Sequence, residues 1–246
     1  MAGAPVIRRP KSDGRCFHCR EILVEPTKDH VFPSSWYPDS TPENVQRWTV
    51  PSCGRCNGEY GDIEKELFVY FALCLDPQKA EASGLAKRAL RSFGVDVSGI
   101  SEEERLHRQA LRDRILKEMK PYTPDIDPHV IPGLEFRPEL RTEGQKQVGI
   151  PADKLHKVLR KIVRGSEYWL AQGRIIDPTW EITVHLMRPA DVPEDVRKLF
   201  SLLGTVYLGP GLAIRRAVAS DGSNAAIYRM IVWGSVTYYS AILPPE

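Results

Sequence analysis

The sequence predicts an α+β protein with a cysteine-rich N-terminal module, a helical middle and a small C-terminal α+β unit with antiparallel strands. Three observations support this fold class. Two C-x-x-C pairs lie in the first quarter of the chain, helical spacing of apolar residues follows them, and runs rich in Val, Ile and Tyr occupy the C-terminal end. The expected units are residues 1–75, 76–150 and 151–246.

Composition and charge are those of an ordinary globular protein. Of the 246 residues, 42% are hydrophobic and 27% are charged, so the chain can bury a sizeable core. The net charge of +2 neither requires nor excludes a nucleic-acid partner, because binding depends on how charges cluster. No apolar run approaches the roughly 18–20 residues of a membrane span. We therefore expect no membrane partner, no secretory leader and a cytoplasmic location.

Four of the five cysteines form two pairs, Cys16 with Cys19 and Cys53 with Cys56. In a reducing compartment, two such pairs indicate a tetrahedral zinc site before they indicate disulfides. The expected cofactor is therefore a structural Zn²⁺. His18 lies inside the first pair, but four thiolates already satisfy zinc, so we expect this histidine to face solvent.

Helical spacing predicts three helices after the second cysteine pair. The first begins near residue 58, with Glu64 outside and the fifth cysteine, Cys74, on the apolar side as a core residue. The second covers residues 78–93. The third starts at Ser101, where a glutamate three residues later completes a capping-box signature. The proline- and glycine-rich stretch 121–150 is interpreted as a linker or irregular edge.

The C-terminal unit is expected to begin with a helix over residues 152–171, which has one apolar and one basic face. Alternating and β-branched runs then predict antiparallel strands, with one further short helix between the first two runs. The expected strand regions are residues 180–187, 205–218 and 225–243, and the short helix covers 193–203.

Between the two cysteine pairs lies the run Lys28-Asp29-His30-Val31-Phe32-Pro33, and Asn57 directly follows the second pair. In an extended segment, neighbouring side chains point to opposite faces, so Asp29 and His30 can serve a metal and a water molecule separately. Asn57 adjoins a zinc ligand, which fixes its position at the start of the first helix.

The full run, CFHC…KDHVFP…ENVQRWTVPSCGRCN, resembles the HNH endonuclease family, in the subgroup where four cysteines bind zinc within a ββα-metal fold. The resemblance covers residues 16–57 and implies metal-dependent hydrolysis of phosphodiester bonds in DNA, with RNA the less favoured substrate. It implies that Asp29 and Asn57 bind one catalytic Mg²⁺ or another divalent ion, that His30 is the general base, and that Asn44 orients it.

Six basic residues are candidates for substrate binding, because phosphate contacts come from clustered cations. They lie in the N-terminal arm and on one face of the helix 152–171, although a charged helix face is more often simply solvated. The candidates are Arg8, Arg9, Lys154, Lys157, Lys161 and Arg164.

Three alternatives to a DNA nuclease remain open at this point. The first is a non-catalytic zinc-binding module that interacts with DNA or protein. The second is a nuclease that cuts RNA. The third is an interaction protein in which the C-terminal unit does the binding and the N-terminal module supports it. The sequence leaves the oligomeric state open.

Overall fold

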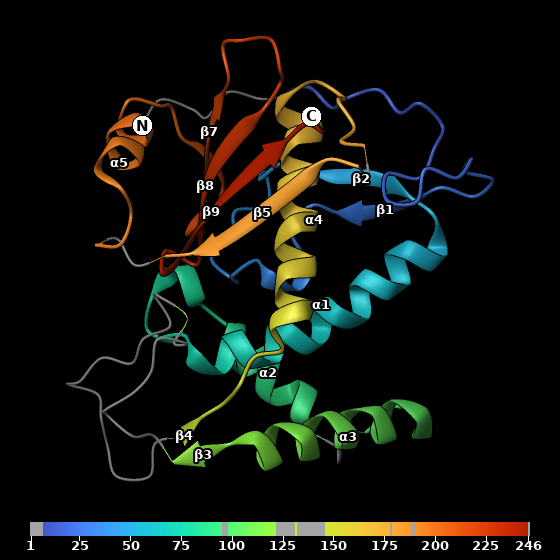
Figure 1. The fold of residues 1–246 in the computed structure, drawn as a ribbon. Coiled ribbons are helices and arrows are strands. Elements are labelled where there is room, and N and C mark those ends of the chain that lie inside the picture. The colour runs from blue at the N-terminus through green and yellow to red at the C-terminus, as the bar shows by residue number, and fades with distance from the viewer. Residues whose placement is uncertain are drawn as a thin grey trace.

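The structure is a computed structural model that describes residues 7–94, 98–121, 131, 146–177, 179–187 and 190–245. It confirms the α+β class (Figure 1): a β-hairpin and a long helix at the N-terminus, a helical middle, and a five-stranded antiparallel sheet in the C-terminal half. Most of the linker expected over 121–150 lies outside the described residues.

The N-terminal module is a hairpin followed at once by a helix. Its strands pair antiparallel, so that Asp29 lies opposite Val50 and His30 opposite Thr49. Cys53 caps the helix, because its Sγ accepts a hydrogen bond from the Cys56 backbone N–H at 3.5 Å. The elements are β1 (Thr27–His30), the short helix η1 (Ser34–Trp36), β2 (Thr49–Ser52) and α1 (Gly54–Cys74).

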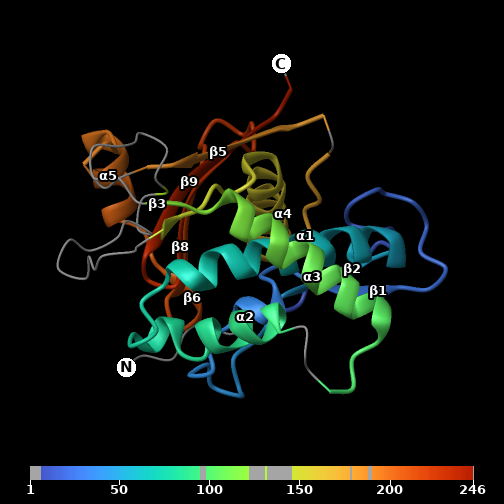
Figure 2. The same ribbon diagram turned by 90° about the horizontal axis from the view of Figure 1, so that it is seen from below.

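The helical middle packs on α1, and Figure 2 shows α1, α2 and α3 together on one side of the molecule. Ser101 caps α3 by accepting a hydrogen bond from the Glu104 backbone N–H at 3.1 Å, which confirms the predicted cap. The elements are η2 (Ala80–Ala82), α2 (Leu85–Phe93), α3 (Glu102–Glu118) and the paired short strands β3 (Lys120–Pro121) and β4 (Lys146–Gln147).

The prediction that Cys74 is a core residue is wrong, because its side chain is exposed. Cys74 is the last residue of α1, and the chain leaves the helix at Leu75 in an extended conformation. No further helical turn covers the thiol.

The C-terminal unit consists of one long helix packed on one face of the sheet. Along β8 and β9 every second residue is buried, as one-sided packing requires. The strand order is β5-β9-β8-β7-β6, so the first strand lies beside the last. The elements are α4 (Ala152–Leu170), β5 (Glu181–Leu186), α5 (Glu194–Ser201), β6 (Val206–Gly209), β7 (Leu212–Val218), β8 (Ala226–Val232) and β9 (Val236–Leu243).

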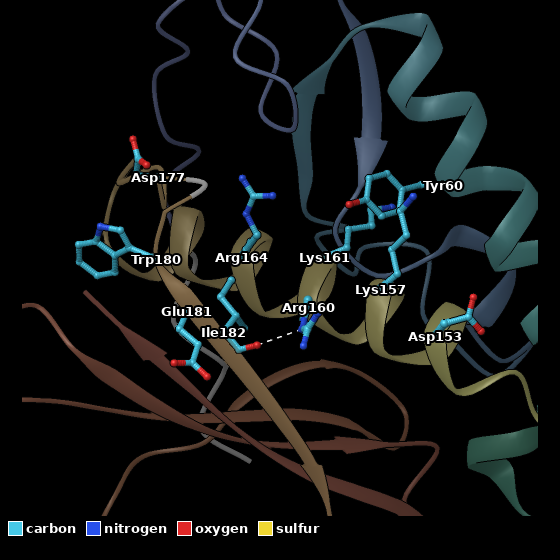
Figure 3. Close-up of a pocket in the computed structure, with 10 residues that line it drawn as sticks. All are labelled: Tyr60, Asp153, Lys157, Arg160, Lys161, Arg164, Asp177, Trp180, Glu181 and Ile182. Carbon is cyan, nitrogen blue, oxygen red and sulfur yellow. Dashed lines mark hydrogen bonds between the residues drawn. The ribbon is translucent and has the colours of Figure 1, made fainter. Parts of the chain in front are cut away.

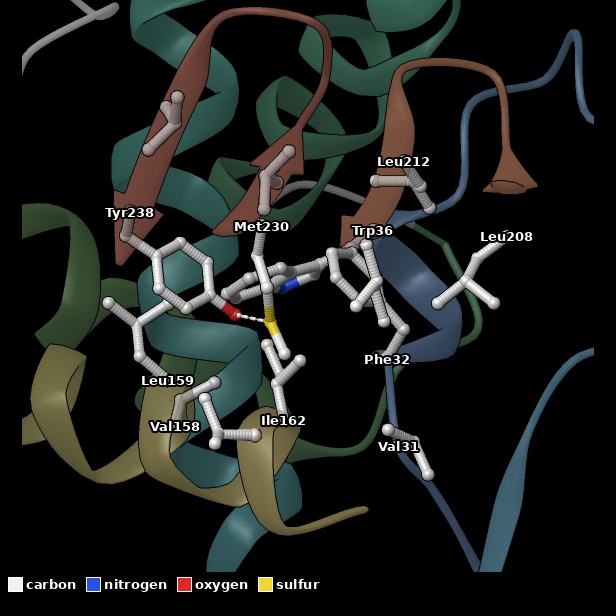
Figure 4. Close-up of a cluster of buried hydrophobic side chains, with 14 of the residues drawn as sticks. Val31, Phe32, Trp36, Val158, Leu159, Ile162, Leu208, Leu212, Met230 and Tyr238 are labelled. Atoms are coloured by element: carbon white, nitrogen blue, oxygen red, sulfur yellow. Dashed lines mark hydrogen bonds between the residues drawn. The ribbon is translucent and has the colours of Figure 1, made fainter. Parts of the chain in front are cut away.

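A single hydrophobic core crosses the boundary at residue 151 that the sequence predicts (Figure 4). Ile162 of α4 lies between the sheet and the N-terminal module, and Trp36 of η1 packs against Trp233 with ring centroids 5.1 Å apart. Trp233 also donates a hydrogen bond from its indole N–H to the Trp36 carbonyl at 2.8 Å. The N-terminal module is therefore joined to the C-terminal unit by packing and by a buried hydrogen bond.

Gly165 lets α4 approach the hairpin closely, since a Cβ at this position would lie 2.7 and 2.8 Å from the two methyl carbons of Val31. Val31 is fully buried and follows β1 directly, so it has little room to move. We expect Gly165→Ala to lower the free energy of unfolding by about 1–3 kcal/mol through overpacking, although alanine is the better helix former by about 1 kcal/mol.

Urea denaturation followed by circular dichroism measures this difference. The matched control is Gly61→Ala in α1, where an added Cβ meets no atom within 4 Å and a neutral or stabilising effect is expected. Equal stabilisation by both substitutions would show that α4 does not press on Val31.

Candidate functional site

The four paired cysteines form one cluster, where the loop that carries the first pair meets the start of α1. Their sulfur atoms all lie within 4.8 Å of one another, and Cys19 and Cys53 have their Sγ atoms 3.9 Å apart. Four thiolates at about 2.3 Å from a tetrahedral Zn²⁺ have sulfurs about 3.8 Å apart. The donor set and its spacing therefore fit a structural zinc ion.

Backbone N–H groups are aimed at the sulfurs of this cluster. The Cys53 N–H donates to the Cys16 Sγ at 3.4 Å. Burial opposes ionisation of Cys16, but the backbone hydrogen bonds from Cys19, Cys53 and His18 outweigh it and lower the pKa of the thiol to about 6. Such donors stabilise thiolate charge and orient the ligands, as the outer shell of a metal site does.

Asp29 and His30 lie on opposite faces of β1, as the extended conformation predicts. Asp29 is 3% exposed and faces α1 and α4. His30 is half-buried and ends the strand. The pair therefore occupies two separate environments.

Asp29 belongs to a buried charge cluster, which we define as His18, Asp29, Glu64 and Lys161. The Lys161 ammonium donates to Asp29 Oδ1 at 2.6 Å and pairs with Glu64. His18 Nε2 lies 2.7 Å from the other oxygen, Asp29 Oδ2. Burial raises the pKa of Glu64 to about 7, although the Lys161 charge opposes this shift. The cluster joins the hairpin, α1 and α4 in one network.

Two expectations are corrected by this cluster. His18 does not face solvent: its side chain is 5% exposed, bonded to Asp29, and packed against Tyr60 with ring centroids 4.5 Å apart. Glu64 does not point outward but is buried against Lys161. The common reason is α4, which covers this side of the N-terminal module.

A divalent ion at Asp29 and Asn57 is not accommodated by this arrangement. Both carboxylate oxygens of Asp29 already have partners, and one partner is the Lys161 ammonium, whose positive charge opposes a bound cation. Asn57 donates its amide N–H to Thr27 Oγ1 at 3.2 Å, which leaves its Oδ1 as the one oxygen of the pair not engaged by this contact, so the obstacle to an ion lies at Asp29. Within the described parts of the chain, only the four cysteines form a group of three or more His, Cys, Asp or Glu ligands close enough to hold an ion.

Two arginines are connected with His30, Arg9 through the residue opposite it and Arg47 through its charge. The cross-strand neighbour of His30 is Thr49, whose hydroxyl accepts a hydrogen bond from Arg9 Nη2 at 3.5 Å. Burial lowers the pKa of His30, and the charges of Lys161 and Arg47 lower it further while Asp29 opposes them. The imidazole is therefore neutral at pH 7, which is the form that accepts a proton.

Asn44 and Arg8 are the other two candidates in the N-terminal module. Asn44 is exposed in a turn, and no hydrogen bond among the described residues joins it to His30. Arg8 is exposed beside Arg9.

The basic face of α4 is mostly neutralised by carboxylates of α1. Lys154 donates to Glu66 at 2.7 Å, and Lys157 pairs with Glu59. Lys161 is buried in the charge cluster. These lysines attach α4 to α1 and are not free surface cations. Among the described residues, by contrast, the hydrogen bonds of Arg164 go only to the backbone carbonyls of Phe17 and Ile176.

Sequence reasoning missed the burial of His18 and Glu64, which join Asp29 and Lys161 of α4 in the charge cluster. The one available signal was a carboxylate at position 64 in a helix whose surroundings are apolar.

Comparison of the chain with protein-family models gave no match, and searches of curated proteins and of solved structures gave none either. Among the helices that the structure describes, none combines the length and the apolar character that crossing a membrane requires.

Proposed function

We propose that the protein hydrolyses phosphodiester bonds in DNA through a zinc-bound ββα module of the HNH type, with His30 as the general base. One observation carries the proposal: in the order β1-β2-α1, with four cysteines clustered beside it, a half-buried His30 lies opposite Thr49, which Arg9 contacts, and within reach of the Arg47 charge. The histidine is the last residue of β1, and part of its side chain is exposed.

The surroundings of His30 suit phosphoryl transfer. A neutral imidazole takes the proton from an attacking water, and fixed cations stabilise the negative charge that develops on the phosphate oxygens. Arg9 is held through Thr49, directly across the hairpin from His30.

The Mg²⁺ or other divalent ion expected at Asp29 and Asn57 stays a prediction, and it requires Lys161 to release Asp29. No step of the proposed mechanism is assigned to that ion, because the carboxylate is engaged by Lys161 and His18.

We expect His30→Ala to reduce cleavage at least about 100-fold, the lower end of what general-base catalysis contributes. Plasmid DNA and a matched RNA are incubated in parallel with wild type and variant, with Mg²⁺, Mn²⁺ or EDTA. The control is Lys28→Ala, which removes an exposed side chain from the same face of β1. Both variants must keep the zinc content and melting temperature of the wild type.

The pH profile of cleavage gives a second readout of the same role. Because the folded pKa of His30 lies below its usual 6.5, the base form persists below that pH, and kcat/KM should fall only as the pH drops through the lowered value. Cleavage by His30→Ala at the wild-type rate would remove the histidine from the mechanism.

A non-catalytic zinc module that binds nucleic acid or protein is the second candidate. The buried charge cluster favours it, since Asp29 serves there in a structural network. This alternative predicts that no ion supports cleavage of either polymer and that His30→Ala changes nothing.

A further inference from the structure

A pocket of about 490 Å³ lies between α4, the start of α1 and the segment that leads into β5 (Figure 3). This volume falls in the range of small-molecule binding sites, roughly 300–1,000 Å³. The pocket combines basic side chains with two aromatic rings, Tyr60 and Trp180. Its basic residues are Lys157, Arg160, Lys161 and Arg164.

The four cations lie on one face of α4, because their spacing of three, four and seven residues repeats with the helix. Lys157 and Lys161 are neutralised by carboxylates. Arg160 and Arg164, one turn apart, form no ion pair within the described ranges. Their hydrogen bonds go to backbone carbonyls, from Arg160 Nε to Ile182 at 3.0 Å and from Arg164 Nη2 to Ile176 at 3.4 Å.

Arg164 has hydrogen-bonding capacity to spare. Its Nε is buried and has no partner among the described residues. A buried donor without an acceptor costs about 1–3 kcal/mol, so an acceptor supplied by a ligand would be stabilising. The two arginines offer an anion planar donors that no carboxylate among the described residues pairs with directly, although the charge of Asp177 acts on Arg164 from a distance.

The acidic residues of the pocket lie toward its edges. Figure 3 places Asp153 and Asp177 at the two ends of the row of cations, and Glu181 on β5. Asp177 is already engaged as an acceptor from the Thr179 N–H at 2.9 Å. The middle of the pocket is therefore its most positive part.

We propose that this pocket binds a phosphate group of a nucleic-acid strand, held by Arg160 and Arg164. Guanidinium groups match phosphate with two parallel hydrogen bonds, and the aromatic walls can contact the attached sugar or base. The nucleic-acid part of this assignment rests on the proposed function. Lys161 connects the pocket with the proposed catalytic site. It lines the pocket, and its ammonium contacts Asp29, the neighbour of His30.

The test measures binding without cleavage. In a His30→Ala background, fluorescence anisotropy gives the Kd for a labelled single-stranded oligonucleotide over a series of salt concentrations. Arg160→Gln with Arg164→Gln should weaken binding at least tenfold and reduce the slope of log K against log salt by about 0.7, for one phosphate no longer neutralised. The matched control is Arg197→Gln with Lys198→Gln, which removes two exposed cations of α5.

Arg160→Gln alone is the safeguard against misfolding, because Arg160 is exposed and Arg164 is partly buried. This single variant should lose less affinity for the oligonucleotide than the double variant does, with its zinc content unchanged. The proposal would be overturned if the pocket and control variants lost oligonucleotide affinity equally, or if the pocket variants lost none.

A second arm separates a strand phosphate from free phosphate. Inorganic phosphate, added at a concentration equal to that of the phosphate groups in the oligonucleotide, should displace the oligonucleotide only weakly. If it competes equally well, the pocket binds free phosphate and the nucleic-acid assignment is wrong. If the protein never cuts DNA or RNA, yet the pocket variants still lose oligonucleotide binding, the nuclease proposal fails and the pocket stands.

Discussion

Removing the metal from the four-cysteine cluster, by chelation or by Cys53→Ser, is expected to unfold the β1-β2-α1 module. Binding of structural Zn²⁺ to small modules is worth about 10–16 kcal/mol at pH 7, as much as the entire stability of a typical domain, about 5–15 kcal/mol. Cys53 has a second role, because its sulfur caps α1. A serine hydroxyl at this position can still cap α1, so the expected unfolding comes from the lost zinc ligand.

Zinc content by mass spectrometry and thermal melts with and without a chelator measure this effect. The matched control is Cys74→Ser, which changes the exposed fifth cysteine and should leave one zinc per chain and the melting temperature unchanged. If Cys53→Ser melts like the wild type and keeps its zinc, the cluster is not a structural metal site.

The cysteine cluster was predictable from the sequence because its signal is local. Each C-x-x-C pair forms a tight turn by itself, and only one long-range step is needed to bring Cys16 and Cys53 together. The opposite orientation of Asp29 and His30 was predictable for the same reason, since it follows from strand geometry alone. Helix positions, including the Ser101 cap, also depend on neighbouring residues.

The buried charge cluster was not predictable in this way. Lys161 stands 132 residues from Asp29, and the periodicity of α4 shows only which residues share a face, not what packs on that face. A lysine on a polar face is usually solvated, and here a second helix covers it. The pairing of β5 with β9 is hidden for a similar reason, because strand order depends on contacts that no local pattern records.

Lys161→Met is expected to lower the free energy of unfolding by about 3–5 kcal/mol, the usual effect of removing one partner from a buried ion pair. Asp29 and Glu64 would be left as buried carboxylates without their cation. The matched control is Lys154→Met, whose partly exposed pair with Glu66 should contribute less than about 1 kcal/mol. Urea denaturation of both variants and the wild type, at several pH values, measures the difference.

The pH dependence distinguishes lost charge pairing from lost packing. Burial raises the folded pKa of Glu64 above its unfolded value, near 4.3, and the loss of Lys161 removes the charge that opposes this rise. A carboxyl whose folded pKa is raised loses stability as the pH rises through that value, so the deficit of Lys161→Met should be largest at pH 8 and shrink toward pH 5. A deficit below about 1 kcal/mol, or one independent of pH, would mean that the charge cluster does not form.

The Lys161→Met variant also tests whether Asp29 can hold a divalent ion. With the ammonium gone, Mn²⁺ can reach the two carboxylates, and a bound ion would raise the melting temperature by mass action. Stabilisation of Lys161→Met by Mn²⁺, beyond that of the wild type and abolished by adding Asp29→Asn, would show that Lys161 and the ion compete for one site. The predicted catalytic ion would then require Lys161 to move. Identical responses of variant and wild type would place any catalytic metal away from Asp29.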